Sequence, residues 1–250
     1  MFGIFPIKGS KKSEKITSDI YVLYELPNLD SNIYLIVNSK SVSKEKSEIC
    51  LIDSGNGLNT PNLIEGIKNL GFNPRNINKI LITHEHLDHI LGVFKLKEFI
   101  ENSFDIYALG ETARTIREGD ERSIAPIELG IGISLFNTKI KPLEVIEVKE
   151  GDIIPVGDKK LKVIYTPGHS LGSMSLYEEN IKILFCGDVV FCGGSFGRVD
   201  FPGGSANELK NSINRLSKLD VKYLCPGHMN FSDKGNEEIS YSERMIELYL

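Results

Sequence analysis

The 250-residue sequence contains no tryptophan, only five histidines and only four cysteines. The cysteines are Cys50, Cys186, Cys192 and Cys225; they show no C-x-x-C spacing and lie mostly within apolar runs. This pattern is typical of buried thiols in a reducing compartment, so we expect no disulfide framework.

Long apolar runs and an excess of positive charge are also missing. No stretch approaches the roughly 18 apolar residues of a membrane-spanning helix, and the apolar stretch at residues 1–7 is too short for a signal-peptide core. The formal net charge of −5 argues against extended contact with nucleic-acid phosphates. We therefore expect a cytoplasmic protein that acts on a small molecule, with no nucleic-acid or membrane partner. A homodimer is one option for its assembly.

Apolar runs and amphipathic segments alternate along the chain, which is 41% hydrophobic and long enough to bury a large core. Patterning predicts strands at 20–24, 31–37, 48–52, 79–83, 105–109, 151–165 (a hairpin arm), 174–177, 182–186 and 222–225. Helical spacing is seen at 62–70, 90–100 and 207–219. With no visible repeat or linker, we expect a single domain over residues 1–250.

Three of the five histidines are concentrated in one short motif. Residues 83–89 read Thr-His-Glu-His-Leu-Asp-His, which places His84, His86, Asp88 and His89 directly after an apolar run. A single histidine is more often structural than a ligand. Three beside an aspartate reverse that expectation, because imidazole and carboxylate are the usual ligands of zinc, iron and manganese. The motif predicts a metal site.

The other two histidines lie in similar surroundings. His169 belongs to a Thr-Pro-Gly-His-Ser turn and His228 to a Pro-Gly-His turn, each after a strand-like run. Asp188 follows another such run, in Phe-Cys-Gly-Asp. No histidine in the sequence is thus left outside these motifs.

This ordered series of motifs resembles the ligand set of the metallo-β-lactamase superfamily, over about residues 18–230. The segments 166–173 and 197–204 are similar to local patterns of its glyoxalase II-like (hydroxyacylglutathione hydrolase-like) branch. The resemblance implies an α/β fold, a four-layer αβ/βα sandwich of two mixed sheets flanked by helices, with the site at one edge of the sheets.

The resemblance also implies a role for each motif residue. One ion would be bound by His84, His86 and His169, the other by Asp88, His89 and His228, with Asp188 bridging them. Asp53 corresponds to a carboxylate that braces the ligand loop, although a turn-forming Asp is the alternative reading. We expect two divalent ions per chain, zinc first, with iron or manganese as alternatives.

Such a centre implies a hydrolase in which a hydroxide between the ions cleaves a thioester or related ester, with Asp88 and Asp188 as catalytic carboxylates. A persulfide dioxygenase resembles the chain through the same motifs but holds a single iron with two His and one Asp. A lactonase and a tRNA 3′-processing nuclease are further alternatives, and the acidic balance disfavours the nuclease.

Two segments bear on the substrate. Arg198 could receive a substrate carboxylate, but an internal pair with Asp200 is at least as compatible with the sequence. Residues 111–144 are expected to lie over the site and contact the substrate. Only residues 229–250 follow His228, so we expect no C-terminal helical glutathione-binding domain and a wide tolerance for the thiol.

Overall fold

The computed structural model describes residues 12–38, 43–100, 103–126 and 130–250. The apolar stretch at residues 1–7 and a part of the segment 111–144 lie outside these ranges.

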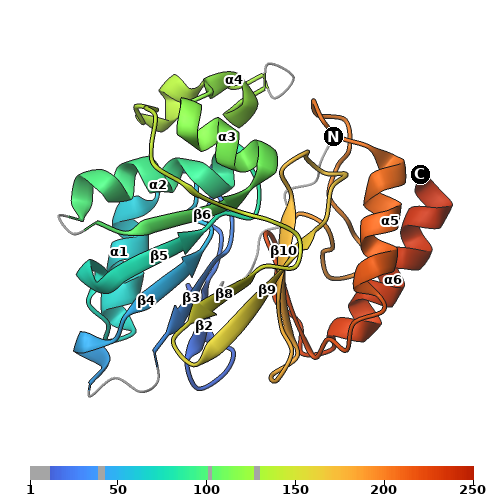
Figure 1. Ribbon diagram of the computed structural model, residues 1–250, viewed down its shortest axis with the longest axis horizontal. Helices are drawn as coiled ribbons and strands as arrows, with labels where there is room; N and C mark the ends of the chain where they lie inside the picture. Colours follow the sequence, from blue (N-terminus) through green and yellow to red (C-terminus); the bar gives the residue numbers. More distant parts are fainter. Residues whose placement is uncertain (1–11, 39–42, 101–102, 127–129) are drawn as a thin grey trace.

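The first part of the chain forms a seven-stranded mixed sheet (Figure 1). In spatial order, its strands are β1 (Ser13–Lys15), β2 (Ile20–Leu23), β3 (Ile33–Val37), β4 (Ile49–Ile52), β5 (Ile77–Leu81), β6 (Asp105–Leu109) and β7 (Ile146–Val148). The pairs from β1 to β4 are antiparallel and those from β4 to β7 are parallel. Parallel neighbours need crossover connections, which the intervening helical segments provide.

The second part forms a five-stranded mixed sheet. Its strands, in spatial order, are β12 (Tyr223–Pro226), β11 (Ile183–Gly187), β10 (Met174–Glu178), β9 (Lys159–Tyr165) and β8 (Ile153–Val156). Only β11 and β12 pair in parallel.

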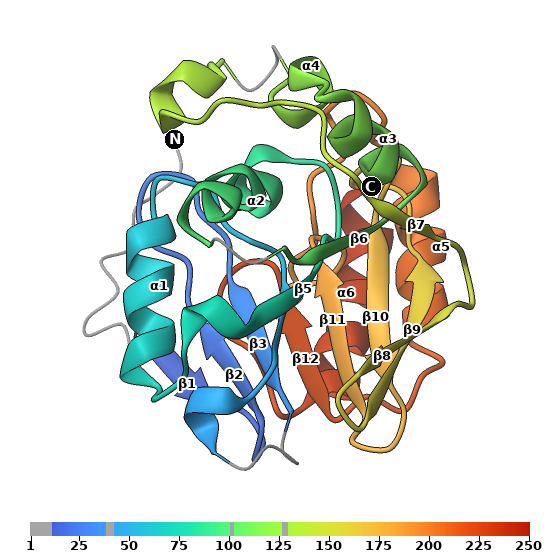
Figure 2. The ribbon, with the colours of Figure 1, turned by 60° about the vertical axis from the view of Figure 1, so that its left-hand side comes forward.

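Two helices cover the outer face of each sheet (Figures 1 and 2). They are α1 (Thr60–Asn69) and α2 (Leu87–Phe99) on the first sheet, and α5 (Ala206–Leu216) and α6 (Gly235–Tyr249) on the second. The layers run helix, sheet, sheet, helix, which confirms the predicted four-layer sandwich.

Four layers create three buried interfaces, and each contains its own apolar cluster. Because side chains alternate along a strand, Leu35 packs toward α1 and α2 while its neighbour Ile36 packs between the sheets. On the far side, Leu184 of β11 packs with Ile213 of α5. Both faces of the two sheets are therefore covered, which explains why β3 and β4 read as continuous apolar runs.

A helical segment lies beyond the strand ends, at the top of Figures 1 and 2. It consists of α3 (Gly110–Glu118), α4 (Glu121–Ile124) and the 3₁₀ turn η4 (Ile133–Phe136). Thr112 of α3 donates a hydrogen bond of 2.7 Å to Glu85 in the histidine motif. This segment, which we call the cap, therefore contacts the candidate site.

The elements that were not predicted include the strands β1 and β7 and the helix α6. The strands β1 and β7 have three residues each, and β7 exposes two of them. The helix α6 falls where the sequence suggested only a short tail, although Ile239 and Ile246 are buried seven positions apart. This spacing places both on one face, against α5 and the second sheet.

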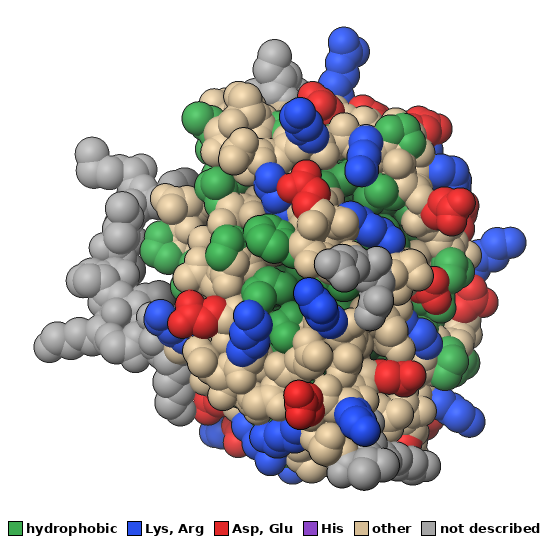
Figure 3. Space-filling view, turned by 90° about the vertical axis from the view of Figure 1, so that its left-hand side faces the viewer, with side chains coloured by type: hydrophobic (Ala, Val, Ile, Leu, Met, Phe, Trp, Pro, Cys, Tyr) green, Lys and Arg blue, Asp and Glu red, His purple; other side chains and the backbone are tan. Residues whose placement is uncertain are grey.

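The face shown in Figure 3 carries acidic and basic side chains interspersed, with no large area of one sign. No helix in the described ranges has the length and apolar character required to cross a membrane.

Candidate metal centre

The histidine motif follows β5 and leads into α2. The strand ends at Leu81, earlier than predicted, and an irregular segment carries His84 and His86. The helix begins at Leu87, so Asp88 and His89 lie in its first turn. The rings of His84 and His86 still converge, with centroids 4.8 Å apart.

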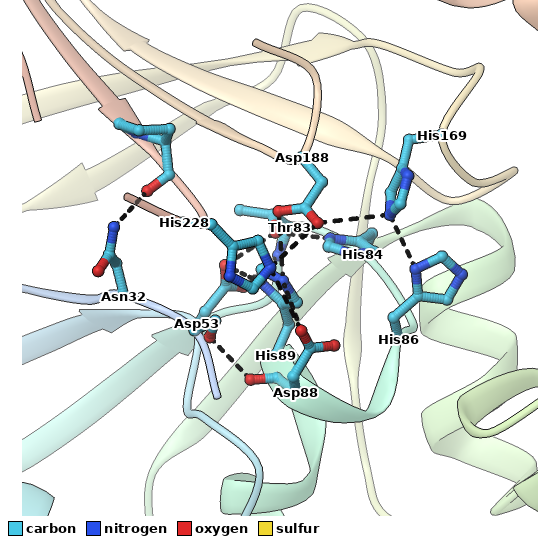
Figure 4. Close-up of polar contacts among 12 residues, drawn as sticks. Asn32, Asp53, Thr83, His84, His86, Asp88, His89, His169, Asp188 and His228 are labelled. Atoms are coloured by element: carbon cyan, nitrogen blue, oxygen red, sulfur yellow. Dashed lines mark hydrogen bonds and ion pairs between the residues drawn. The ribbon is translucent and has the colours of Figure 1, made fainter. Parts of the chain in front are cut away.

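The other three motif residues come from turns of the second sheet. His169 lies between β9 and β10, Asp188 directly follows β11, and His228 follows β12. All seven predicted ligands meet where the two sheets come together, and Figure 4 shows them facing a common centre.

The first predicted cluster is compact. The ligand atoms of His84, His86 and His169 all lie within 4.8 Å of one another. His86 Nδ1 and His169 Nε2 are only 2.9 Å apart, and all three residues are buried. Three buried nitrogens aimed at one point can hold a metal ion.

The second cluster is formed by Asp88, His89 and His228, whose ligand atoms also lie within 4.8 Å of one another. Asp188 stands between the clusters: Oδ1 is 3.3 Å from His89 Nε2, while Oδ2 is 3.2 Å from His228 Nε2 and 3.5 Å from His169 Nε2. Its carboxylate can therefore serve both sites.

The residues fit a bound metal on their own chemistry. His84 Nε2, His89 Nε2 and Asp188 Oδ1 are fully buried and make no hydrogen bond in the described ranges, although His89 Nε2 and Asp188 Oδ1 lie 3.3 Å apart as an ion pair. Burying an unpaired polar atom costs roughly 1–3 kcal/mol, so such atoms are rare and call for an explanation. Three that converge on one point are accounted for if they are metal ligands.

Burial and neighbouring charges shift the pKa values of histidines in opposite directions in the two clusters. Burial, reinforced by nearby imidazoles, lowers the pKa of His84 well below its usual value and that of His86 to about 3. These two rings therefore stay neutral at physiological pH. They present free lone pairs, the form in which imidazole binds metal.

The second cluster behaves in the opposite way. Burial disfavours the charged form of His89, but Asp188, Asp53 and Asp88 outweigh burial and raise its pKa to about 10. Burial likewise opposes the charge of His228, yet the same Asp188 leads the carboxylates that raise its pKa. Metal entering this cluster must therefore displace protons.

Asp53 braces the histidine motif from behind. Its Oδ2 lies 2.8 Å from His89 Nδ1 and accepts from the Thr83 hydroxyl at 2.9 Å, while Oδ1 accepts from the Thr83 amide at 2.8 Å. Because that hydroxyl donates to Asp53, it accepts from His84 Nδ1 at 3.1 Å. These bonds leave Nε2 of His84 and of His89 facing the centre.

The backbone at Asp53 is unusual, with φ at 61°. A left-handed conformation is uncommon outside glycine, although aspartate tolerates it better than most residues. The turn aims the carboxylate at the histidines, which goes beyond the simple turn-forming role that the sequence left open.

Two further residues that hold the site, Glu25 and Asn32, lie near the start of the first sheet and were not predicted from the sequence. Glu25 Oε2 lies 2.7 Å from His228 Nδ1. Asn32 donates from Nδ2 to the carbonyls of Pro226 and Met229 at 3.1 and 2.7 Å, and so fixes the turn that carries His228. A Cβ on Gly227 in that turn would lie 2.2 Å from Asp188 Oδ1, so only glycine fits there.

The centre opens into a cleft of about 700 Å³. Ile124 and Pro126 of the cap line it, as expected for part of the segment 111–144. Arg198 also lines the cleft, but its guanidinium donates to both carboxylate oxygens of Asp200 at 2.6 Å, the internal pair that the sequence allowed. Its backbone carbonyl, 2.7 Å from His169 Nδ1, fixes the orientation of that ring.

Comparison with known proteins agrees with this geometry. The profile described as the metallo-beta-lactamase superfamily matches residues 26–228. A probable metallo-hydrolase of Methanocaldococcus jannaschii is 30% identical over 82% of this chain and 90% of its own length. A hydroxyacylglutathione hydrolase of Haemophilus influenzae is 28% identical, over 81% and 90%. An acyl-coenzyme A thioesterase of Gallus gallus is 31% identical, over 72% and 68%.

Solved structures show the same fold. A metallo-beta-lactamase family protein of Thermus thermophilus superimposes with a TM-score of 0.75 at 20% identity, over 94% of this chain and 81% of its own. Another protein, solved in a di-iron-bound form, gives a TM-score of 0.65 at 28% identity, over 85% and 94%.

Proposed function

Because the chain belongs to the metallo-beta-lactamase superfamily, we propose that it is a dinuclear metal-dependent hydrolase that cleaves a thioester, or a related ester, of a small molecule. The observation that carries this proposal is the set of buried ligand atoms on His84, His89 and Asp188, which face one centre and make no hydrogen bond in the described ranges.

Two ions per chain follow from two ligand clusters that share Asp188. One ion would be held by His84, His86 and His169, and the other by Asp88, His89 and His228. The nitrogen and carboxylate donors suit zinc, iron and manganese alike, with zinc as our first choice. The di-iron form of a structural relative makes iron the main competitor.

Bound divalent ions would acidify a water so that it can attack at neutral pH, and would polarise the substrate carbonyl. Side chains of the protein hold the reacting groups in position. Asp53 and Glu25 hold the rings of His89 and His228 in place. Asp88 lines the cleft with 19% of its side chain exposed; its Oδ2 faces His228 Nε2 at 3.3 Å, which leaves the other carboxylate oxygen to accept the proton that the attacking water loses.

The cysteines do not compete as nucleophiles. Burial raises the pKa of the Cys186 thiol, and it raises that of Cys192 to about 12. Neither thiol is ionised at neutral pH, and the thiolate is the reactive form.

The nature of the leaving group favours a thioester. A thiol with an ordinary pKa near 8.5 departs as a thiolate without first receiving a proton, whereas an amine cannot. Among the described residues that line the cleft, Asp200 is the one carboxylic acid outside the ligand set, and its bond to Arg198 lowers its pKa and keeps it ionised. Two relatives named for thioester substrates support the same choice.

The test combines elemental analysis of protein purified without added metal with hydrolysis of a matched thioester, oxygen ester, lactone and amide. We expect two ions per chain and the highest kcat/KM for the thioester. The Cys192→Ser variant is the control and should retain activity. Metal-loaded protein that cleaves no thioester, or a Cys192→Ser variant that is inactive, would refute the proposal.

The metal content and the preferred substrate of the protein separate the alternative functions. One iron per chain together with oxygen consumption on a persulfide would indicate a dioxygenase, and preference for the lactone would indicate a lactonase. Cleavage of a tRNA 3′ trailer would identify a nuclease.

A further inference from the structure

The walls of the metal cleft are largely apolar. Six side chains that form them, from four separate segments of the chain, are Leu29, Ile124, Phe191, Phe196, Phe201 and Met229. Burial of apolar surface is favourable only when both partners are apolar. Apolar walls beside a charged centre would therefore be unusual in a site for a substrate that is polar throughout.

Two of these residues stand at the rim with strained backbones. Leu29 and Met229 are 46% and 49% exposed, and their φ angles are 54° and 65°. A left-handed conformation in a bulky residue other than glycine is an outlier that costs of order 1–3 kcal/mol. The fold therefore holds two large apolar side chains at the mouth of the cleft in an unfavourable conformation.

Hydrogen bonds from asparagines maintain both positions. Asn56 donates from Nδ2 to the carbonyls of Asn28 and Leu29 at 2.8 and 2.9 Å. Asn32 donates to the Met229 carbonyl at 2.7 Å, and the Met229 amide donates to Glu25 at 3.0 Å. Since Glu25 also contacts the His228 ring, the rim at Met229 is tied directly to the metal centre.

The described walls of the cleft offer no unpaired lysine or arginine to an anionic group. Arg198 is the single lysine or arginine among its described lining residues, and both oxygens of Asp200 occupy its guanidinium. The ring of Phe201 lies 4.1 Å from that guanidinium and covers it further. An acyl chain that ends in a carboxylate would meet apolar walls and the charge of Asp200.

We propose that this cleft selects thioesters of neutral, apolar acyl groups of about four carbons or more, and that Leu29 and Met229 are specificity-determining residues. The inference rests on the proposed thioester hydrolysis. We assign the acyl group rather than the thiol to this cleft because peptide and nucleotide thiol carriers bear several charges, for which it has no free partner.

The first experiment varies each side of the thioester separately in the metal-loaded protein. Acetyl, butyryl and hexanoyl esters of one neutral thiol are compared with acetyl esters of thiols of increasing apolar length. A fully buried methylene is worth about fourfold, and because the cleft is open we expect hexanoyl to exceed acetyl at least tenfold in kcat/KM. A pentanoyl ester should likewise exceed the succinyl ester of similar length at least tenfold.

The second experiment changes the rim. Leu29→Asn and Met229→Asn remove the apolar side chain but place a residue that tolerates the left-handed conformation, so both variants should fold. We expect each to lower the hexanoyl-to-acetyl ratio at least threefold. Leu248→Asn, at a residue 75% exposed on α6 and outside the cleft lining, is the control that should leave the ratio unchanged.

A binding measurement supplies a readout independent of turnover. Titration of the protein with nonhydrolysable thioethers should show tighter binding of the hexyl compound than of the ethyl compound, and Leu29→Asn should reduce that difference. Equal rates for acetyl, succinyl and hexanoyl esters, or a chain-length effect confined to the thiol, would overturn the inference while leaving thioesterase activity intact. Failure to cleave any thioester would instead refute the proposed function.

Discussion

Asp188 is the residue on which both ligand clusters depend, because its two oxygens face histidines of both. Replacing Asp188 with Asn removes the negative charge that would hold two cations together. We expect the variant to lose metal from both sites, measured as ions per chain after dialysis. The Asp200→Asn variant, which changes an exposed carboxylate in the same cleft, is the control and should keep both ions. Unchanged metal content in Asp188→Asn would show that this residue is not a shared ligand.

Of the seven predicted ligands, Glu25 braces only His228, through the contact of 2.7 Å to Nδ1. Loss of such a partner typically weakens metal affinity by about 10–100-fold. We expect Glu25→Gln to weaken the ion held by Asp88, His89 and His228 and to spare the other, as resolved in a two-step metal titration. Glu65→Gln, on the exposed side of α1, is the matched control. Equal weakening of both ions would contradict the assignment.

The ionisation of His89 predicts how the metal-free protein responds to pH. Its pKa is raised from 6.5 to about 10, against burial, by Asp188, Asp53 and Asp88. A raised pKa means that the stabilisation is complete below about pH 6.5 and is lost as pH rises toward 10. We expect the urea midpoint of metal-free protein to fall between pH 7 and 10, with a smaller fall in His89→Gln. A fall of the same size in both proteins would show that other groups are responsible.

At acidic pH the stability of the metal-free protein changes with pH in the opposite direction. Burial lowers the pKa of His86 to about 3, so its contribution is complete above about pH 6.5 and is lost as pH falls toward 3. Taken by themselves, the shifts of these two histidines favour the folded, metal-free protein most near pH 6.5.

Individual residues differed in how far the sequence could predict them. The seven predicted ligands could be identified from the sequence because histidine is rare in this chain and each ligand lies in a short motif that follows an apolar run. Glu25 was not, because it meets His228 across 203 positions and glutamate is common on surfaces. Long-range pairing of an ordinary residue type leaves no local signal.

The helix α2 approaches the turn after β4 so closely that one position tolerates no side chain. A Cβ on Gly92 would lie 1.8 Å from the carbonyl oxygen of Ser54, whose hydroxyl and amide both bond the His89 carbonyl. We expect Gly92→Ala to lower the free energy of unfolding by about 1–3 kcal/mol, measured with urea, because the helix must shift.

The matched control is Gly132→Ala in the cap. A Cβ there would find its nearest neighbour at 3.5 Å, and the φ of −89° suits alanine. We expect a change below about 0.5 kcal/mol, as for ordinary surface substitutions. An equal effect of both substitutions would mean that close packing at Gly92 is not the cause.

Helices and strands were predicted where the apolar pattern in the sequence is strong. They were missed where contacts with the rest of the fold determine the conformation. Strands such as β3 and β4 are continuous apolar runs, buried on every residue. In α6, by contrast, buried positions include Gly235 and Ser242 beside two isoleucines, so its apolar stripe is weak in sequence. Short strands such as β7 owe their conformation to a neighbouring strand and carry no pattern of their own.

At the scale of the whole molecule, the positions of charged residues bear on which thiol carries the acyl group of the proposed substrate. The glutamates of the C-terminal segment, residues 229–250, lie on α6, which packs on the outer face of the second sheet, and Arg198 of the cleft is already paired with Asp200. We therefore expect kcat/KM for a glutathione thioester to stay within about 100-fold of that for a simple neutral thiol ester with the same acyl group. A larger preference, equivalent to roughly 2.7 kcal/mol of transition-state binding, would reveal a dedicated glutathione pocket.

The two sheets divide the chain without interleaving, since the first uses residues 13–148 and the second residues 153–226. Each ligand cluster nevertheless takes two residues from the first part and one from the second. A fragment that ends near Glu150 would fold toward half a sandwich with no complete cluster, and so would its complement. If the chain binds metal as proposed, metal retention would therefore report that its two halves, which are encoded separately, have packed together correctly.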